Sequence, residues 1–432
     1  MKRNDGDLPI DWVLPPFAGH LFPALTVACD LKALGFRNQR ILSTPSARAA
    51  VEDCGLEFMP LLAGREAEIL SIANSEAQVG ASPRQLLRQF KDTLGVLRIL
   101  GDEAARLWRV APPRVVIADS VLPTAGLAAE RAGAQWWTSM MSICPTETRT
   151  GTPAYLGGWT PGRGPWPRIR NAAGRAGSRA FKRAAAWLAR RELRAIGLGK
   201  IYRPDGSEAF YSGTRILAFG LPEFEFPRDD WPAAMEFVGP ALGSPIQSPP
   251  APPVLDGTPH LLVTIGTHLL WAKERAARIA LELSHHLPGW IVHFSRGDVE
   301  AARSREPARQ IGPSCFEFRY IPYGKNLGNY AAIVHHGGSG ISYAALSEGV
   351  PAVVWPHDYD QFDHAAQIEY HGFGLRSDGD ADRDPNGHSV ALAHAVQRLV
   401  REPRFRERAR WMAERIARTA PAEAVANALY GL

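Results

Sequence analysis

Apolar residues in the first half of the chain fall into short continuous runs separated by stretches with helical spacing. The runs that we expect to be buried strands are Ile10–Leu14, Gln39–Ser43, Leu56–Leu61 and Arg114–Ala118. Helical spacing extends from Pro23 to Leu34, from Leu86 to Val110 and from Pro123 to Gly133. Strands that alternate with helices in this way predict an α/β domain built on a parallel sheet.

The same alternation starts again in the second half of the chain. The expected strands are His260–Ile265, Trp290–Phe294, Cys315–Tyr320, Ala331–Val334 and Pro351–Trp355. Between the halves, residues from Leu242 to Pro253 are rich in proline and serine and lack periodicity, which predicts an extended linker. A chain of 432 residues is too long for one ordinary core. We therefore expect two domains, residues 1–241 and 259–402, joined by a linker at 242–258 and followed by helices in 403–432.

A glycine-rich loop follows the expected strand Ala331–Val334 and leads into a helical pattern. In His335-His336-Gly337-Gly338-Ser339-Gly340, three glycines let the backbone approach a ligand closely. A helix that begins here directs unpaired N–H groups and the positive end of its dipole at the loop. The segment therefore predicts an anion site, and a diphosphate is its natural occupant.

This segment and the residues after it resemble a known family. His336-x-Gly338, Ser347-Glu348-Gly349-Val350-Pro351, Pro356 and Asp360-Gln361 resemble the donor-binding signature of inverting nucleotide-sugar glycosyltransferases that act on small molecules in plants and bacteria. The resemblance runs with gaps from Trp12 to Gly374 and is weakest between Thr146 and Tyr211. It implies the GT-B fold, in which two Rossmann-like domains face each other across a cleft and a C-terminal helix crosses back to the first domain.

Two residues of the first half are candidates for catalysis. His20 follows the expected strand Ile10–Leu14, and Asp119 follows Arg114–Ala118, so both lie at the carboxyl ends of strands, where open α/β sheets bind ligands. On their own, a loop histidine is more often a surface residue or helix cap, and a lone aspartate can cap a turn. The resemblance implies instead that His20 is the general base and that Asp119 orients it. An imidazole of ordinary pKa suits that task at neutral pH.

The resemblance also implies which residues contact the nucleotide sugar. The predicted donor-binding residues are Gly266, Thr267, Tyr320, Ile321, Tyr323, His336, Gly338, Ser339, Gly340, Ser342, Asp360 and Gln361. For Tyr320 and Tyr323, packing in the core or at the rim is an equally good explanation. Asp358-Tyr359-Asp360 matches an Asp-x-Asp metal pattern, which we interpret as chance, because related enzymes neutralise the diphosphate without a metal. We expect no cofactor beyond the nucleotide-sugar co-substrate.

The sequence departs from the family pattern at two donor-site positions. Ile341 stands where a serine or threonine usually donates to phosphate, so that hydrogen bond must come from Ser339, Ser342 or backbone amides. Ala344 stands where many UDP-sugar enzymes carry a glutamate that accepts from both ribose hydroxyls. Since deoxyribose lacks the 2′-hydroxyl, we expect a dTDP-deoxysugar such as dTDP-rhamnose as donor, with UDP-hexoses next.

Charge and cysteine spacing add two further expectations. The net charge is +5, and between Arg163 and Arg203 twelve lysines and arginines stand against one acid, Glu192. Much of this segment, from Ala172 to Ile196, is expected to form one basic amphipathic helix, which predicts either peripheral contact with an acidic membrane, a wall of the acceptor pocket or a solvated surface. No nucleic-acid motif accompanies the charge. The four cysteines are widely spaced, without a metal or disulfide pattern, and no run is long enough to span a membrane. We therefore expect a cytoplasmic protein, with peripheral contact at the inner membrane face as an alternative.

These patterns predict an inverting glycosyltransferase that transfers a sugar to a hydroxyl of a small-molecule or lipidic acceptor. Two alternatives remain on the sequence alone. A sugar-nucleotide epimerase of the same architecture would isomerise the donor without an acceptor. A non-catalytic sugar-nucleotide-binding protein would not need the pair formed by His20 and Asp119.

Overall fold

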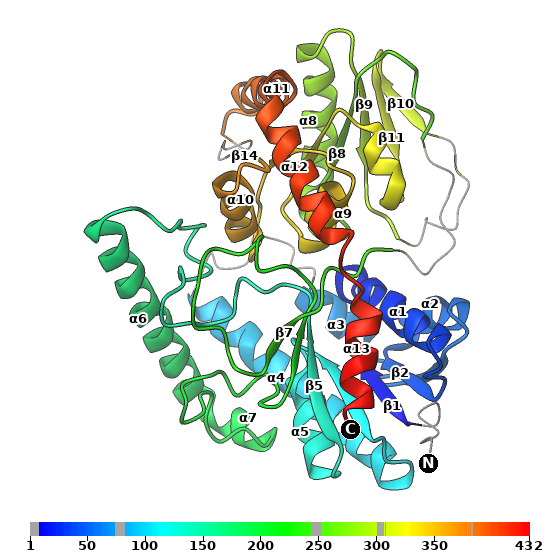
Figure 1. Ribbon diagram of the computed structural model, residues 1–432, viewed down its shortest axis with the longest axis vertical. Coiled ribbons are helices and arrows are strands. Elements are labelled where there is room, and N and C mark those ends of the chain that lie inside the picture. Colours follow the sequence, from blue (N-terminus) through cyan, green and yellow to red (C-terminus); the bar gives the residue numbers. More distant parts are fainter. Residues whose placement is uncertain are drawn as a thin grey trace.

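The computed structural model describes residues 8–73, 83–243, 252–299, 306, 308–377, 379, 381 and 383–432. Residues 244–251 of the expected linker lie outside this part of the chain. The described elements form two α/β bodies, one above the other in Figure 1. The expected α/β architecture of two parallel sheets is confirmed.

The lower body contains a parallel sheet in the order β3-β2-β1-β4-β5-β6-β7. Its strands are β1 (Ile10–Val13), β2 (Gln39–Ser43), β3 (Glu57–Pro60), β4 (Val115–Asp119), β5 (Gln135–Met140), β6 (Ile216–Ala218) and β7 (Met235–Phe237). Its helices are α1 (Ala18–Ala33), α2 (Arg48–Asp53), α3 (Glu66–Ala73), α4 (Pro83–Val110), α5 (Pro123–Arg131), α6 (Pro165–Leu188) and α7 (Arg190–Ala195), with a 3₁₀ turn at Pro45–Ala47.

The upper body contains a second sheet in the order β10-β11-β9-β8-β12-β13-β14, parallel except for the pair β10 and β11. Its strands are β8 (His260–Thr264), β9 (Ile291–Ser295), β10 (Arg309–Gly312), β11 (Cys315–Phe318), β12 (Ala332–His335), β13 (Ala352–Val354) and β14 (Gly374–Arg376). Its helices are α8 (Lys273–His286), α9 (Ser339–Ser347), α10 (Gln361–Tyr370) and α11 (Pro385–Arg401), with 3₁₀ turns at Leu270–Ala272 and Gly324–Asn329.

Alternation along β1 divides the core of the lower body between the two faces of its sheet. Ile10 and Trp12 point to the face covered by α1, whereas Val13 points to the face covered by α4 and α5. Because successive side chains of a strand point to opposite faces, both faces of this sheet are buried under helices. The segments that follow the carboxyl ends of the strands face the upper body.

The last two helices connect the bodies. Helix α12 (Pro403–Ile416) packs against α9 in the upper body, and α13 (Pro421–Tyr430) packs against α1 in the lower body (Figure 1). Val425 and Leu429 of α13 belong to the core around β1. The chain thus crosses between the bodies a second time, and the two crossings touch, since a Cβ on Gly239 would come within 2.3 Å of the Thr419 Cβ. The expected return of the C-terminal helix is confirmed.

Helix α1 begins earlier than the sequence predicted. We expected Pro23 at its first turn, but the helix starts at Ala18, and the N–H groups of His20 and Leu21 both donate to the Phe17 carbonyl. Proline cannot donate, yet burial of Leu21 and Phe22 against the core extends the helix upstream of it. His20 therefore lies in the first turn of a helix and not in a loop.

The basic segment forms two helices where one was expected from Ala172 to Ile196. Helix α6 ends at Leu188, Ala189 has non-helical backbone angles, and α7 follows. The sequence analysis also did not single out β5, β6, β7, β10 or β14. These strands are short or lie toward the edges of the sheets, except β5, which is central.

Candidate active site

A cavity of about 870 Å³ lies between the two bodies, at the carboxyl ends of both sheets. From the lower body it is lined by the segments that follow β1, β4 and β5. From the upper body it is lined by the segments that follow β8, β11, β12 and β13. Ligands of open α/β sheets bind at this edge, so the cavity is the natural place for a substrate.

His20 and Asp119 form a pair on the lower wall. His20 Nδ1 lies 3.0 Å from Asp119 Oδ2, and the Val121 N–H donates to the other carboxylate oxygen at 3.0 Å. Asp119 is 1% exposed and stands behind the imidazole, whereas His20 lines the cavity. The carboxylate accepts from Nδ1–H, which leaves the lone pair of Nε2 for a substrate proton.

Four effects set the pKa of His20. Burial lowers the pKa of the imidazole, but the charge and the hydrogen bond of Asp119 raise it more, with a further contribution from Asp360. The net pKa lies above the ordinary value of 6.5. A base held in this way is stabilised as it accepts a proton.

The opposite wall carries the first turn of α9. Gly338 is the N-cap of this helix with extended backbone angles, and Gly337 before it has a φ of 96°, a region that favours glycine. The first N–H groups of α9 therefore have no intrahelical acceptor, and Gly338, Ser339 and Gly340 line the cavity. This turn has the geometry of an anion site.

The His336 ring lies between two glycines of this wall. A Cβ on Gly266 would meet the ring at 2.5 Å, and a Cβ on Gly338 would meet it at the same distance. Burial lowers the pKa of His336 well below its ordinary value, and the neighbouring His335 and His357 lower it further. His336 is thus a neutral imidazole held in place by backbone, next to the first turn of α9.

Gly266 is itself fixed by a buried lysine. Lys273, the first residue of α8, donates from Nζ to the Gly266 carbonyl. Burial lowers the pKa of Lys273 to about 7, with a smaller effect from the Arg296 charge that Asp298 opposes. This contact holds the loop after β8 against the His336 ring.

Contacts between the bodies fix the loop before α10. Ser142, after β5, donates to the Asp360 carboxylate, and Ser339 of α9 donates to the Met141 carbonyl at 2.8 Å. Gln361 accepts from the His357 and Asp358 N–H groups at 2.9 and 3.1 Å. Asp360 and Gln361 therefore face the cavity on a loop whose backbone is held by its own side chains.

Most predicted donor-site residues are brought together by the fold, and two are not. Those that line the cavity are Gly266, Thr267, Tyr320, Tyr323, His336, Gly338, Ser339, Gly340, Asp360 and Gln361. Ile321 is fully buried and does not line it. Ser342 is 1% exposed, and its hydroxyl donates to the Gly338 carbonyl, so it is not available to a phosphate. Ile321 packs into the core with Leu262 and Ile333, and the helical turn of α9 directs the Ser342 hydroxyl back to Gly338.

The remaining wall of the cavity, in the lower body, is apolar. It is lined by Leu61, Leu62, Ile69, Val96, Leu97, Leu100 and Leu122, which come from α3, α4 and the loops after β3 and β4. His20 lines the same cavity as this wall and the first turn of α9. A hydrophobic molecule with one hydroxyl near His20 matches that distribution of surface.

Two residues of the site were missed by the sequence analysis. His268 packs edge-on against Phe17 at the cavity wall, with 5.3 Å between the ring centroids. Burial lowers the pKa of His268 to about 4. Its position directly after Gly266-Thr267 was an available signal. Ser142 was missed because the strand before it, β5, was not recognised.

Comparisons with known proteins show what this chain is similar to. Residues 298–431 match the family described as erythromycin biosynthesis protein CIII-like, C-terminal domain. The chain is 26% identical over 446 residues to 4'-demethylrebeccamycin synthase of Lentzea aerocolonigenes, covering 95% of this chain and 96% of that protein. It is 25% identical over 211 residues to a PGL/p-HBAD biosynthesis rhamnosyltransferase of Mycobacterium bovis, covering 48% of this chain and 43% of that protein.

Two solved structures share the fold over nearly the whole chain. The glycosyltransferase of kitacinnamycin matches with a TM-score of 0.68 and 21% identity, covering 96% of each chain. The glycosyltransferase VinC, solved in complex with dTDP, matches with a TM-score of 0.64 and 18% identity, covering 97% of this chain and 98% of that one. Within the described residues, none of the helices combines the length and the hydropathy that crossing a membrane requires.

Proposed function

This chain is a glycosyltransferase of the GT-B fold, and from that premise we propose that it transfers a sugar from a nucleotide diphosphate to a hydroxyl of a small-molecule or lipidic acceptor, with inversion. One observation carries the proposal. The pair of His20 and Asp119 and the first turn of α9 lie on opposite walls of a single cavity. A base and an anion site that face each other fit a displacement in which the acceptor attacks opposite to the leaving group.

In the proposed mechanism, His20 Nε2 takes the proton of the acceptor hydroxyl as its oxygen bonds to the anomeric carbon. The bond from that carbon to the diphosphate oxygen breaks, and the departing charge is received by the N–H groups of α9 and by His336. Asp119 stabilises the imidazolium that forms on His20. In this proposal the N–H groups and the imidazole take the place of a metal ion.

The test compares variants of the pair with a matched control. His20→Ala should lower turnover roughly 10²–10⁴-fold, because general-base catalysis typically contributes that much. Asp119→Ala should lower it less, since the imidazole remains. Asp30→Ala changes an exposed carboxylate of the same helix and should have no effect. Product is measured by mass spectrometry, and binding of the nucleotide diphosphate by calorimetry.

Nucleotide binding should stay nearly unchanged in the His20 variant, which separates lost chemistry from lost structure. Near-normal turnover of that variant with an unactivated alcohol would contradict the mechanism. The same assay run without acceptor detects a sugar-nucleotide epimerase, which would convert the donor alone.

We further propose that the donor is a dTDP-deoxysugar, such as dTDP-rhamnose. Ala344 lines the cavity where a ribose-binding carboxylate would stand, and among the described residues the acids that line the cavity are Asp358 and Asp360, both in the loop before α10. A carboxylate is costly to bury unless both ribose hydroxyls satisfy it, so a site for deoxyribose has less reason to keep one. The relatives include a rhamnosyltransferase and a protein that binds dTDP, which supports the proposal.

Calorimetric titration with dTDP and UDP tests this donor assignment. We expect dTDP to bind at least as tightly as UDP, and dTDP-rhamnose to be a better substrate than UDP-glucose. If UDP bound about ten-fold more tightly, a difference of about 1.4 kcal/mol, UDP-hexoses would become the preferred donors.

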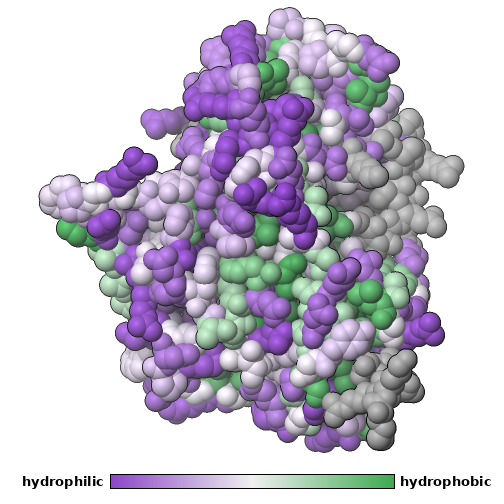
Figure 2. All heavy atoms as spheres, viewed as in Figure 1, coloured by the Kyte–Doolittle hydropathy of each residue, from purple (hydrophilic) through white to green (hydrophobic). Residues whose placement is uncertain are grey.

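We also propose that α6 contacts a lipid surface, in an orientation opposite to the one we expected. Two of its basic residues face inward: Lys182 pairs with Glu147 and Glu208 at 2.7 Å, and Arg179 pairs with Glu147 at 3.2 Å, whereas Arg168, Arg170 and Arg183 are exposed. Trp166, Ile169, Phe181, Trp187 and Leu188 are exposed as well, with Trp166 78% exposed. In Figure 2 apolar side chains lie along the left edge of the molecule, where α6 runs, beside hydrophilic ones. Exposed tryptophans flanked by arginines are typical of interfacial helices.

Vesicle co-sedimentation distinguishes this contact from a solvated surface. The protein should bind vesicles that contain anionic lipid, and the double variant Trp166→Ser and Trp187→Ser should bind much less. Val110→Ser removes an apolar side chain that is 87% exposed elsewhere, and should not matter. Failure of the unchanged protein to sediment, or equal binding by the double variant, would rule out the apolar face as the contact.

A further inference from the structure

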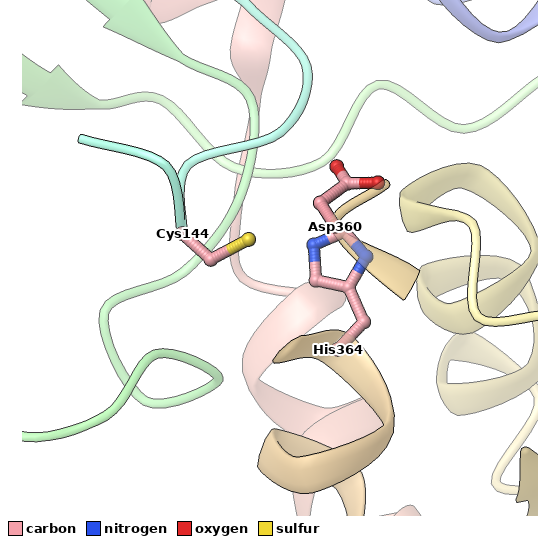
Figure 3. A group of neighbouring side chains, drawn as sticks. All are labelled: Cys144, Asp360 and His364. Atoms are coloured by element: carbon pink, nitrogen blue, oxygen red, sulfur yellow. The ribbon is translucent and has the colours of Figure 1, made fainter. Parts of the chain in front are cut away.

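Three side chains with metal-ligand atoms gather beside the cavity, where the loop after β5 meets the start of α10. The ligand atoms of Cys144, Asp360 and His364 all lie within 4.8 Å of one another. Figure 3 shows Cys144 reaching from its loop toward Asp360 and His364, which stand on successive turns at the start of α10. Cys144 and His364 are each 2% exposed, so the group is inside the protein.

The orientation of His364 leaves one ring nitrogen available to a metal. Nδ1 lies 2.7 Å from the Gly337 carbonyl, which can only accept, so Nδ1 carries the proton. Nε2 then holds the lone pair, and it points toward the Ser142 hydroxyl at 3.4 Å. Metal-binding histidines are typically fixed in this way, with the other nitrogen donating to a carbonyl or carboxylate.

The Ser142 oxygen shows that a polar atom can lie among the three groups. It donates to Asp360, lies 3.7 Å from Cys144 Sγ and is within reach of His364 Nε2. Because its one proton goes to Asp360, this hydroxyl offers no donor to Nε2. A cation at the centre of the group could therefore interact with all three ligand atoms, whereas the hydroxyl donates a hydrogen bond to Asp360 alone.

We propose that Cys144, Asp360 and His364 bind Zn²⁺. A thiolate, an imidazole and a carboxylate are the donor types that zinc accepts together, at roughly 2.3 Å for sulfur and 2.0–2.2 Å for nitrogen and oxygen. Tetrahedral angles at those lengths separate the donor atoms by roughly 3.3–3.7 Å, so the side chains must close by about 1 Å. Ser142 turns away to another rotamer, and water takes the fourth position on the cavity side.

Binding displaces the proton of Cys144. A cysteine binds zinc as the thiolate, so the thiol must give up its proton. The S–H bond breaks as the S–Zn bond forms, and the proton passes to solvent. One proton is therefore released for each zinc ion bound.

The ion would compete with the sugar of the donor, a consequence that rests on the proposed function. Asp360 lines the cavity and is the predicted partner of the sugar hydroxyls. A carboxylate bound to zinc is no longer free to accept from them. Zinc should therefore weaken binding of the nucleotide sugar while leaving binding of the free nucleotide diphosphate unchanged.

Calorimetric titration of the whole protein with ZnCl₂ tests the site directly. We expect one ion per chain and, from titrations in two buffers of different ionisation heat, one proton released. Co²⁺ in place of Zn²⁺ should give the near-ultraviolet absorption of a thiolate ligand. Cys144→Ser and His364→Gln should each weaken zinc binding at least about ten-fold.

A matched control excludes the two partly exposed thiols, Cys29 and Cys54. Cys29 and Cys54 are hydrogen-bonded to each other in the lower body, so the double variant Cys29→Ser and Cys54→Ser removes a second place where zinc might bind. It should keep full affinity. Absence of Co²⁺–thiolate absorption, or unchanged zinc affinity in the Cys144 and His364 variants, would overturn the site. Both readouts are independent of catalysis, so they separate this proposal from the proposed function.

Discussion

At the scale of single residues, the site depends on opposing effects on two imidazoles. Burial lowers the pKa of both His20 and His336, but only His20 has a carboxylate behind it, and its pKa is raised as a result. The two rings therefore differ in role although both face one cavity. His20 is suited to accept a proton, and His336 to donate a hydrogen bond while it stays neutral.

Replacing Asp119 by asparagine should reveal this balance in the pH profile. A base must be neutral to act, so kcat/KM should rise with pH through the raised pKa of His20, above 6.5. In Asp119→Asn the negative charge is gone and burial lowers the pKa of His20. The rise of kcat/KM should therefore occur at lower pH, and the maximal kcat/KM reached at high pH should fall. His268 does not titrate in this window, because its pKa is about 4.

The measurement is kcat/KM between about pH 5 and 9 for both proteins, with Asp30→Asn as the control that keeps the original profile. If kcat/KM of Asp119→Asn rose over the same pH range as that of the unchanged protein, a group other than His20 would set the pH dependence.

At the scale of elements, the position of Asp119 depends on how closely α5 packs on β5. Gly126 of α5 lies against the Trp136 ring, and a Cβ there would approach ring atoms to 2.0 Å. Helix α5 and β5 flank β4, which ends at Asp119. Gly126→Ala should therefore destabilise the lower body by about 1–3 kcal/mol, as overpacking usually does.

Gly95 offers a matched comparison in a neighbouring helix. It lies inside α4 with nothing within 4 Å of its Cβ position, so Gly95→Ala should stabilise by about 0.5–1 kcal/mol. Thermal unfolding followed by circular dichroism should move the midpoint down for Gly126→Ala and up for Gly95→Ala. Equal shifts of the same sign would show that contact with Trp136 does not decide the outcome.

The sequence predicted where strands and helices lie better than it predicted which way their side chains face. Strand exits could be found because an apolar run followed by glycine or a polar residue marks a strand end, and this located His20, Asp119 and the loop after β12. Periodicity also showed that α6 has two faces. It could not show which one faces inward, since that depends on ion pairs with Glu147 and Glu208, which stand outside the helix.

The same limit explains the missed parts of the site. Ser142 and Cys144 meet Asp360 and His364 only because the two bodies close on each other, and no local pattern records that contact. Ser342 was predicted to bind phosphate because it follows the glycine loop. The turn of α9 carries its hydroxyl back to the Gly338 carbonyl, a detail of helix phase that sequence spacing does not fix.

At the scale of the whole molecule, the two bodies are joined twice, once between β7 and β8 and once between α12 and α13. In the second connection, α13 continues from the upper body and packs Val425 and Leu429 into the core of the lower body. This packing is noncovalent. A protease site introduced between residues 243 and 252 should therefore leave, after cleavage, one particle of unchanged size in gel filtration.

The control for this cleavage is a chain that ends at Arg418 and so lacks α13. Cut at the same place, that chain should separate into two fragments more readily than the full chain, because it lacks α13 and is held by contacts between the bodies such as Ser142 with Asp360 and Ser339 with Met141. If the full chain also separated, packing of α13 would be too weak to hold the bodies together.

The return of the last helix also brings the two ends of the described chain together. Leu8 and Leu432 pack against the same core, so the first described residue and the last one meet in one body. A circular permutant that joins these ends by a short peptide and opens between 243 and 252 would keep every described contact. Its gene would begin with the upper body, and the lower body would be translated last, with α13 already made before β1 emerges.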